Sequence, residues 1–367
     1  MILWRILAFL AGSFLVLYTF LSAARTFVLP RRASVKLTRV VFLAVRWVFD
    51  WLCKGLSTFE QKDELMAMYA PLALLIMVPV WLFTTTLGYM LVFWALGVEP
   101  WSRAFVLSGS SILTLGFALA DTLPQTIIAF TEATIGLILV AMLISYLPTM
   151  YSAFSKREMM VSLLEVRAGL PPSAPELVWR LHGLNRDPAE FQAFWQSWES
   201  WFAELEENHT SLTALVFFRS PQSGQSWVNA AGVVLDAAAL FQSVVAQPPT
   251  VHPTLVIRAG MLALRRIAEM FKVPFNPDPH FPEDPISVNR SEFDEAYDRL
   301  ISQGIEVKAD RELAWKNFAG WRVNYDSVLV ALSRLTMAPP APWLSDYTFI
   351  PADITKGETA GKLQKVR

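Results

Sequence analysis

The chain has 367 residues, of which 54% are hydrophobic and 17% charged, and its net charge at pH 7 is −1. Soluble globular proteins are less apolar and more charged, so this composition indicates a membrane protein. The near-zero charge gives no basis for a nucleic-acid partner. The single cysteine, Cys53, excludes an intrachain disulfide and a metal cluster built from cysteines.

The first apolar segment runs from Ile6 to Ala24. A cleaved signal peptide is one interpretation, because Arg5 precedes the segment and small residues end it. The alternative is an uncleaved helix with its N-terminus outside. It is favoured because basic residues are frequent between Arg25 and Glu64, and basic residues stay in the cytoplasm. We therefore expect a transmembrane helix in residues 1–24 and a cytoplasmic linker in residues 25–64.

Within this linker, residues 35–56 are predicted to form an amphipathic helix. At about 100° per residue the charged side chains share one narrow stripe. They are Lys36, Arg39, Arg46, Asp50 and Lys54. The other face carries Val40, Phe42, Leu43, Trp47, Val48 and Trp51. This pattern favours a helix that lies in the membrane interface, and a helix packed on a soluble domain is the alternative.

Two longer apolar segments follow. Leu65–Val98 contains no charged residue, and Thr122–Ser155 contains Glu132 alone. Both exceed the roughly 20 residues that cross a bilayer. We predict one membrane span at about 71–97, running outward, and a second at about 125–147, running inward. Basic residues directly after the second segment place its C-terminal end in the cytoplasm.

A short glycine-containing loop separates these two spans. Residues 101–113 are predicted to form a short helix that begins beside Pro100 and re-enters the membrane, followed by extended backbone from Thr114 to Ala118. The carbonyls at a helix C-terminus carry partial negative charge and stabilise a cation. Gly116 permits backbone conformations that turn carbonyls toward a common axis. This arrangement is typical of an ion-selectivity filter.

These residues resemble the potassium-channel superfamily, specifically its two-helix pore module. The match consists of Thr114-Leu115-Gly116-Phe117 to the filter and Asp121-Thr122-Leu123-Pro124 to the D-x-x-P motif that follows it. The resemblance covers about residues 70–155, and the chain as a whole is similar to a bacterial group of ion-channel-like proteins. It implies a filter at Thr114, Leu115, Gly116, Phe117 and Ala118.

The same resemblance implies supporting roles outside the filter. Asp121 and Glu132 are expected to support the pore, and Gly136 is expected to act as a hinge in the inner helix. For Glu132, a hydrogen bond or charge behind the filter and snorkelling to the outer headgroups are both open. One loop cannot enclose a pathway, whereas four around an axis can, so we expect a homotetramer that conducts a monovalent cation.

Three departures from the family pattern limit this expectation. Ala118 stands at the position of the second filter glycine, whose conformation alanine resists. Leu119 and Ala120 are inserted before Asp121, and Leu113 replaces the threonine that usually precedes the filter. The pattern therefore supports a channel-like fold more strongly than potassium selectivity. A non-conducting, channel-derived membrane sensor or scaffold is the alternative function.

Residues 156–350 are predicted to form an all-α cytoplasmic domain, and residues 351–367 a mobile polar tail. The inner helix is expected to continue through Tyr151–Glu165 and to end before Pro171. Further helices are expected at 188–207, 225–247, 253–271, 291–302 and 310–335, with Asp187, Ser291 and Asp310 as caps. The proline-rich residues 274–285 are expected to form an extended loop, which either orders against the helices or binds a partner.

The helix at 188–207 carries an aromatic stripe, which we interpret as core rather than a ligand cage. It consists of Phe191, Phe194, Trp195, Trp198, Trp201, Phe202 and Leu205.

The sequence offers little that indicates catalysis. The four histidines share no metal-ligand spacing, and no phosphate-binding or nucleophile motif is present. We therefore expect no catalytic residue, no metal site and no cofactor, and a membrane enzyme is a third hypothesis without a supporting residue. The prediction is a mainly α, multi-pass cell-membrane protein with three transmembrane helices, a re-entrant pore helix and loop, and a cytoplasmic regulatory domain whose ligand or protein partner stays open.

Overall fold

The computed structural model describes residues 2–27, 36–169, 171–184, 188–222, 224–247, 250–344, 347–349 and 363–365. The chain is mainly helical, as predicted. It divides into two compact units, unit 1 (Met1–Ala153) and unit 2 (Phe154–Arg367). The boundary falls inside one long helix, α6 (Leu123–Ala168).

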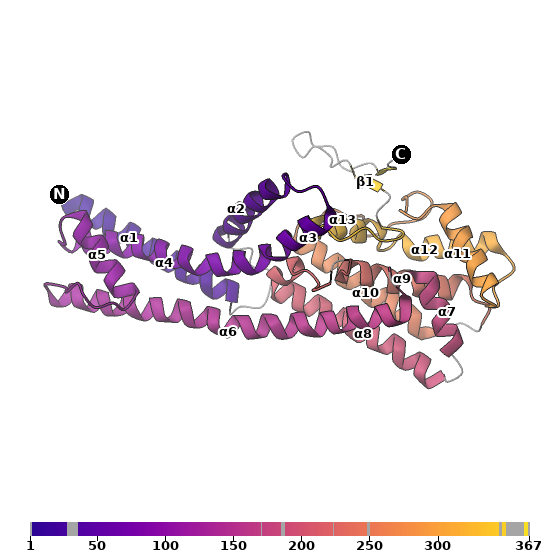
Figure 1. Cartoon of the computed structure of the whole chain (residues 1–367). Helices are drawn as coiled ribbons and strands as arrows, with labels where there is room; N and C mark the ends of the chain where they lie inside the picture. The colour runs from indigo at the N-terminus through magenta and orange to yellow at the C-terminus, as the bar shows by residue number, and fades with distance from the viewer. Residues whose placement is uncertain are drawn as a thin grey trace. The chain divides into compact units, whose positions relative to one another are not determined.

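Unit 1 contains the predicted apolar helices. Its elements are α1 (Ile2–Phe27), α2 (Lys36–Cys53), α3 (Phe59–Ala67), α4 (Tyr69–Ala95), α5 (Trp101–Ile112) and the first part of α6 (Figure 1). The short helix α3 was not predicted. It begins after Thr58, whose hydroxyl accepts a hydrogen bond from the backbone of Gln61 and so caps the helix.

Helices α1 and α4 pack closely because small residues meet where they cross. A Cβ atom on Gly12 would lie 2.4 Å from the carbonyl oxygen of Gly88, so neither glycine leaves room for a side chain. At one end of the pair, Arg5 forms an ion pair of 2.7 Å with Glu99. This pair brings the N-terminal end of α1 beside the chain that follows α4, so the two helices run antiparallel. Helix α1 is thus an integral part of unit 1.

Helix α2 packs on α4 by one face and leaves a second apolar face uncovered. Val41 and Phe49 are buried, and the Phe49 ring lies 5.8 Å from the ring of Tyr69 at the start of α4. On the other side Trp47 is 72% exposed and Trp51 63% exposed. The predicted amphipathic helix is therefore present, with its large apolar side chains unpartnered within the described chain.

Unit 2 is a helical bundle. It consists of the end of α6, then α7 (Ala174–Leu184), α8 (Pro188–Ser211), the 3₁₀ turn η1 (Thr213–Phe217), α9 (Trp227–Val244), α10 (Val251–Met270), α11 (Arg290–Ser302), α12 (Arg311–Arg322), α13 (Asp326–Thr336), and the antiparallel strands β1 (Tyr347–Phe349) and β2 (Leu363–Lys365). Helix α7 and η1 were not predicted. The rest of the predicted tail, 351–362 and 366–367, and the predicted cap Asp187 lie outside the described residues.

Two details of the predicted helices were wrong. The helix expected at 310–335 is two helices, because the chain turns between Arg322 and Asp326 so that both side chains meet in the core. Helix α11 is capped by Asn289 rather than Ser291. Asn289 forms a reciprocal capping box with Glu292, and the Ser291 hydroxyl only donates to the Asn289 side chain. The predicted cap at the start of α12 is confirmed.

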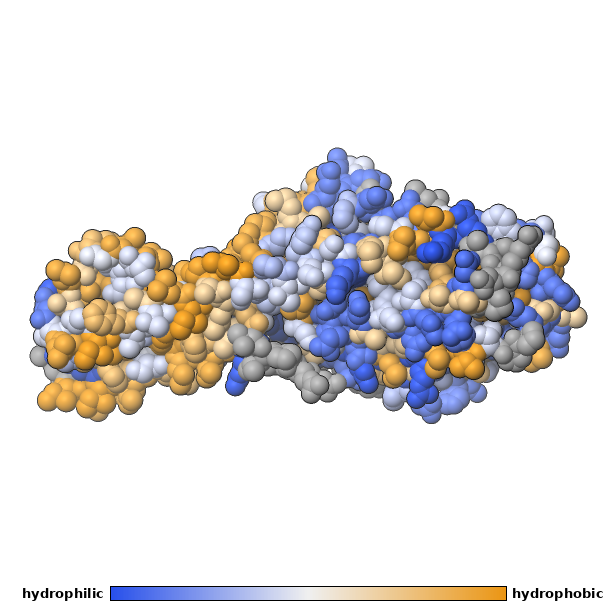
Figure 2. All heavy atoms as spheres, turned by 90° about the horizontal axis from the view of Figure 1, so that it is seen from below, coloured by the Kyte–Doolittle hydropathy of each residue, from blue (hydrophilic) through white to orange (hydrophobic). Residues whose placement is uncertain are grey.

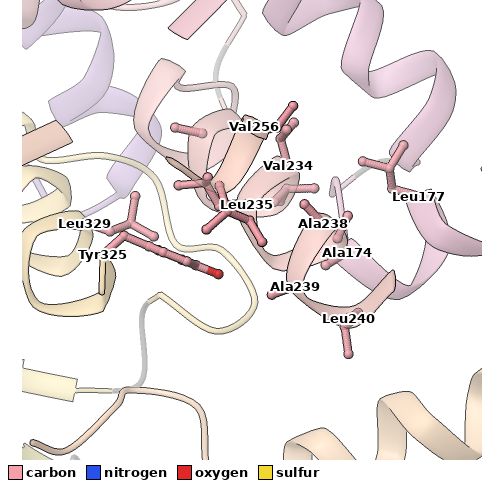
Figure 3. Packing of buried hydrophobic residues seen from close by; sticks show 14 of the residues in the cluster. Ala174, Leu177, Val234, Leu235, Ala238, Ala239, Leu240, Val256, Tyr325 and Leu329 are labelled. Carbon is pink, nitrogen blue, oxygen red and sulfur yellow. The ribbon is translucent and has the colours of Figure 1, made fainter. Parts of the chain in front are cut away.

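Helix α9 lies at the centre of unit 2 and is buried on all sides. Side chains from α7, α10 and α13 surround it, including Leu177, Val256 and Leu329 (Figure 3). The aromatic stripe of α8 is core, as predicted, since its Trp and Phe side chains from Phe194 to Phe202 are buried and Phe191 packs against them half-buried. This burial explains why α9 carries apolar residues on every side, with Asp236 as its one charged residue.

Four helical segments in the described chain are long and apolar enough to cross a membrane: Ile2–Phe27, Phe59–Ala95, Leu123–Ala168 and Trp227–Val244. The last is α9, whose apolar side chains are enclosed within unit 2. The other three leave more than half of their apolar segments unburied, and hydrophobic residues gather at the surface of unit 1 (Figure 2). Such extensive exposed apolar surface indicates a membrane protein.

A buried charge cluster links four segments of unit 2. Arg322, which is fully buried, pairs with Asp236 on α9 and, at 2.7 Å, with Asp326 on α13. The Tyr325 hydroxyl donates to Asp236 at 2.9 Å, and the Ser287 hydroxyl donates to Asp326 at 2.6 Å. Burial opposes the charge of Arg322, but the two aspartates outweigh it and raise the pKa of its guanidinium above the ordinary value.

Replacing Arg322 should destabilise unit 2 strongly. Arg322→Met leaves two buried carboxylates without their cation, which costs about 3–5 kcal/mol. Arg266→Met removes an exposed ion pair with Glu206 and should cost about 0–1 kcal/mol. Guanidinium unfolding of both full-length variants, followed by tryptophan fluorescence, measures the difference. Equal free energies of unfolding for the two variants would contradict a stabilising role of Arg322 in the buried charge cluster.

Candidate functional site

Helix α5 holds the chain that follows it against α4. It begins after Pro100, and its first residue, Trp101, stacks on Trp94 at the end of α4 with ring centroids 4.6 Å apart. Ala104 and Leu107 point into the same apolar cluster as the buried residues of α4. The predicted short helix at 101–113 is therefore present, and the candidate loop directly follows its C-terminal end.

The loop at residues 114–118 turns through two residues in the left-handed region. Thr114 has a φ of +56° and Gly116 a φ of +73°. Glycine adopts this conformation readily, whereas threonine is strained in it, and such strain is concentrated at functional sites. Ala118 is not among the described residues with positive φ. The fifth loop position thus lacks the conformation that would require glycine, which explains how alanine is accommodated there.

Ser110 secures both ends of this loop, and sequence reasoning missed it. Its carbonyl oxygen accepts from the backbone N–H of Leu115 at 2.8 Å, and its hydroxyl accepts from the N–H of Ala118 at 3.1 Å. Ser110 is itself buried. Its position in a Gly-Ser-Ser run was the only sequence signal, because its partners are set by the turn and not by any periodic pattern.

The large apolar side chains of the loop and of the residue that follows it are not covered by the described part of the chain. Leu115 is 59% exposed, Phe117 66% and Leu119 81%. Three large apolar side chains close together on an exposed loop require a lipid, a second chain or both as a partner. The inserted residue Leu119 is the most exposed of the three.

Asp121 anchors the chain between the loop and α6. Its carboxylate pairs with Arg103 in the first turn of α5 at 2.7 Å. Its backbone N–H donates to the side chain of Gln125 at 3.0 Å, and the Gln125 amide donates to the carbonyl of Leu96 at 3.2 Å. Gln125 therefore ties the start of α6 to the end of α4. Sequence reasoning did not single out either Arg103 or Gln125.

Glu132 lies elsewhere, against the middle of α5. Its side chain is fully buried, and one carboxyl oxygen forms a hydrogen bond with the hydroxyl of Ser108. The alternative in which Glu132 snorkels to a headgroup is wrong for this structure. Asp121 and Glu132 are thus not brought together: one binds the first turn of α5 and the other a later turn.

Gly136 allows α5 and α6 to touch. A Cβ atom at Gly136 would lie 2.4 Å from the carbonyl oxygen of Ile112, the last residue of α5. The absence of a side chain therefore determines how close the end of α5, and hence the loop, lies to α6. The hinge role of Gly136 stays a prediction, whereas its packing role follows from this contact.

The C-terminal part of α6 belongs to the core of unit 2 and is held there by Arg157. This buried side chain donates to the carbonyls of Leu215 at 2.9 Å and Phe218 at 2.7 Å, and it pairs with Glu158 at 2.7 Å. One of its nitrogens lies 3.2 Å from Nε2 of His209. Burial and the Arg157 charge hold the pKa of His209 well below its usual range, so its neutral ring accepts this hydrogen bond.

The described residues contain no group of three His, Cys, Asp or Glu side chains that could hold a metal ion. Comparisons of the chain with protein-family models, with curated proteins and with solved structures find no match.

Adding a methyl group at Gly136 should loosen the site. Gly136→Ala forces α6 away from the Ile112 carbonyl, and overpacking of this kind costs about 1–3 kcal/mol. Gly109→Ala in α5 is the matched control, because no described atom outside the adjoining backbone of its own helix lies within 4 Å of its added Cβ. Thermal unfolding in detergent, followed by circular dichroism, should show a lower melting temperature for Gly136→Ala alone. Equal melting temperatures would contradict the close contact.

Proposed function

We propose that the protein is a tetrameric cation channel of the potassium-channel-like type, with an atypical filter at residues 114–118 and a cytoplasmic regulatory domain formed by unit 2. The observation that carries the proposal is the order of elements around the loop. A short helix, α5, ends in a loop with left-handed turns at Thr114 and Gly116, and this loop lies between two long apolar helices. Irregular backbone at membrane depth is tolerated where it lines a water-filled path.

The exposed side chains of unit 1 support assembly of several copies. The loop residues Leu115 and Phe117 are exposed and lack partners among the described residues of the single chain. On α6 a second apolar stripe is uncovered at a spacing of seven residues, which keeps it on one side of the helix. It consists of Phe130, Leu137, Ile144 and Tyr151. Four copies arranged around an axis would cover the loops and enclose a pathway, with the remaining apolar surface facing lipid.

A cation is the ion that the loop would favour. The C-terminal carbonyls of α5 carry partial negative charge, and four such helix ends pointing toward one axis would stabilise a positive ion. The loop itself carries no charged side chain between Thr114 and Ala120. Backbone carbonyls rather than a ring of carboxylates would therefore coordinate the ion, which suits a monovalent cation.

The proposed topology follows the basic residues. Helix α1 would have its N-terminus outside, α4 would run outward, and α6 would return to the cytoplasm. The ion pair between Arg5 and Glu99 fits this arrangement, because it joins the two ends that would face outside. Helix α2 would lie in the inner interface with Trp47 and Trp51 among the lipids.

Helix α6 offers a direct route for regulation. It is continuous from Leu123 to Ala168, so it starts beside the loop and ends in the core of unit 2. Arg157 fixes that end to the backbone of Leu215 and Phe218. A rearrangement of unit 2 would act on the pore through this helix, as in other switches built on helix shifts.

A non-conducting membrane sensor is the second candidate. Ala118 and the inserted Leu119 and Ala120 favour it, because they depart from the family filter. In this alternative the same helix α6 transmits a signal, and the apolar side chain of Phe117 closes the axis.

Reconstitution tests conduction directly. The purified full-length protein in planar lipid bilayers should give single-channel currents carried by monovalent cations. Gly116→Val should abolish the current, because β-branched valine strongly disfavours a φ of +73°. Gly109→Ala should keep it. Absence of current across screens of pH, voltage, membrane tension and ligands would reject the channel in favour of the sensor.

A repaired filter tests the assignment of residues 114–118. Ala118→Gly combined with deletion of Leu119 and Ala120 restores the family spacing before Asp121. Reversal potentials in mixed potassium and sodium solutions should shift toward higher potassium selectivity. Ala118→Gly without the deletion is the matched control and should shift less. Selectivity that stays unchanged in the combined variant would count against this loop as the filter.

A further inference from the structure

We propose that Glu132 is held in its protonated, neutral form and serves as the hydrogen-bond donor that joins α6 to α5 and, through Ser108, to α4. Glu132 is then a proton-binding, positioning residue for α5, the helix that carries the 114–118 loop. This inference concerns the resting structure of unit 1 and does not depend on ion conduction.

The hydroxyl of Ser108 makes two contacts but has a single hydrogen. It lies 3.1 Å from the carbonyl oxygen of Thr86 on α4, and it forms a hydrogen bond with the carboxyl oxygen Oε1 of Glu132 on α6. A carbonyl oxygen can only accept, so the contact with Thr86 uses the serine hydrogen. The contact with Glu132 then needs a hydrogen from the carboxyl group. With that proton in place, the chain Glu132 to Ser108 to Thr86 contains two complete hydrogen bonds.

An ionised Glu132 would leave more polar groups without a hydrogen bond than a protonated Glu132 does. If Glu132 were a carboxylate, the serine hydrogen would serve it and the Thr86 contact would have no hydrogen. The second carboxyl oxygen, Oε2, is buried and has no hydrogen-bond partner among the described residues. A charged oxygen without a partner at membrane depth is far more costly than a neutral carbonyl oxygen in the same place. The protonated form therefore satisfies this geometry best.

The surroundings supply no compensating positive charge. Arg103, a basic residue on α5, pairs with Asp121 at the exposed start of that helix. From α4, the titratable group on this side is Tyr89, whose hydroxyl lies 3.1 Å from the hydroxyl of Thr131. Neither tyrosine nor threonine can carry a positive charge, and Glu132 forms no ion pair in the described part of the chain.

The proton has a structural consequence for the loop. Ser108 and Ser110 lie in the same turn of α5, and Ser110 binds both ends of residues 114–118. Loss of the proton would place a charge between α5 and α6 and turn the serine hydrogen toward Glu132, so that Ser108 would no longer donate to Thr86 on α4. The position of the loop is then linked to the protonation of Glu132.

Infrared spectroscopy tests the proposal on the full chain. We would compare wild type with Glu132→Gln, both in lipid nanodiscs at neutral pH. Glutamine keeps a donor toward Ser108, so the variant should fold. The wild-type-minus-variant spectrum should contain the carbonyl band of a protonated carboxylic acid. The control, Asp121→Asn, changes an exposed acid and should remove only carboxylate bands. A difference spectrum for Glu132 with carboxylate bands alone, whether from a free or a cation-bound group, overturns the proposal.

The pH dependence of stability gives an independent reading. Glu132 binds one proton in the native state that an exposed glutamate loses to water at neutral pH, so native stability falls as pH rises. Above the ordinary pKa of glutamate, about 4.3, and through neutral pH, the melting temperature of the wild type should fall relative to Glu132→Gln by roughly 2–4 °C for each pH unit. A melting-temperature difference between wild type and Glu132→Gln that does not change with pH overturns the proposal.

Discussion

The position of the candidate loop depends on how closely α5 packs between its two neighbours. On the α6 side, Gly136 lets the carbonyl of Ile112 approach to a distance that any side chain would prevent. On the α4 side, the stacked rings of Trp94 and Trp101 hold the start of the helix. Between these contacts, Ser108 bridges Glu132 and the backbone of Thr86. The helix is therefore fixed at its start, middle and end.

This fixation gives physical meaning to the unusual features of the loop. A threonine in the left-handed region persists only when its surroundings impose the conformation, and here Ser110 binds the backbone on both sides of the turn. The large apolar side chains of the turn, Leu115 and Phe117, are exposed and uncovered by the described residues. The loop is therefore held in one conformation by Ser110 and exposes large apolar side chains. Both features suit the proposed packing of the loop against its copies around an axis.

Much of this architecture could be predicted from local patterns. Apolar runs of bilayer-spanning length predict α1, α4 and α6. The aromatic stripe of α8 is correctly predicted to be core because its spacing is helical. Contacts between distant residues could not be predicted in this way. In the sequence, Arg157 is recognisable only as one of the basic residues that follow a predicted membrane span. In the structure, its buried guanidinium donates to backbone carbonyls about 60 residues further along the chain. The break between α12 and α13 escaped prediction for the same reason, since the partner of Arg322, Asp236, lies on another helix.

The most direct test of the channel proposal is an experimental structure of the full-length protein in lipid nanodiscs. The account predicts a fourfold assembly in which the carbonyls of residues 114–118 face a common axis and line an open path, with α6 from each copy surrounding it. A monomer or dimer, or an axis filled by the side chains of Phe117, would contradict it.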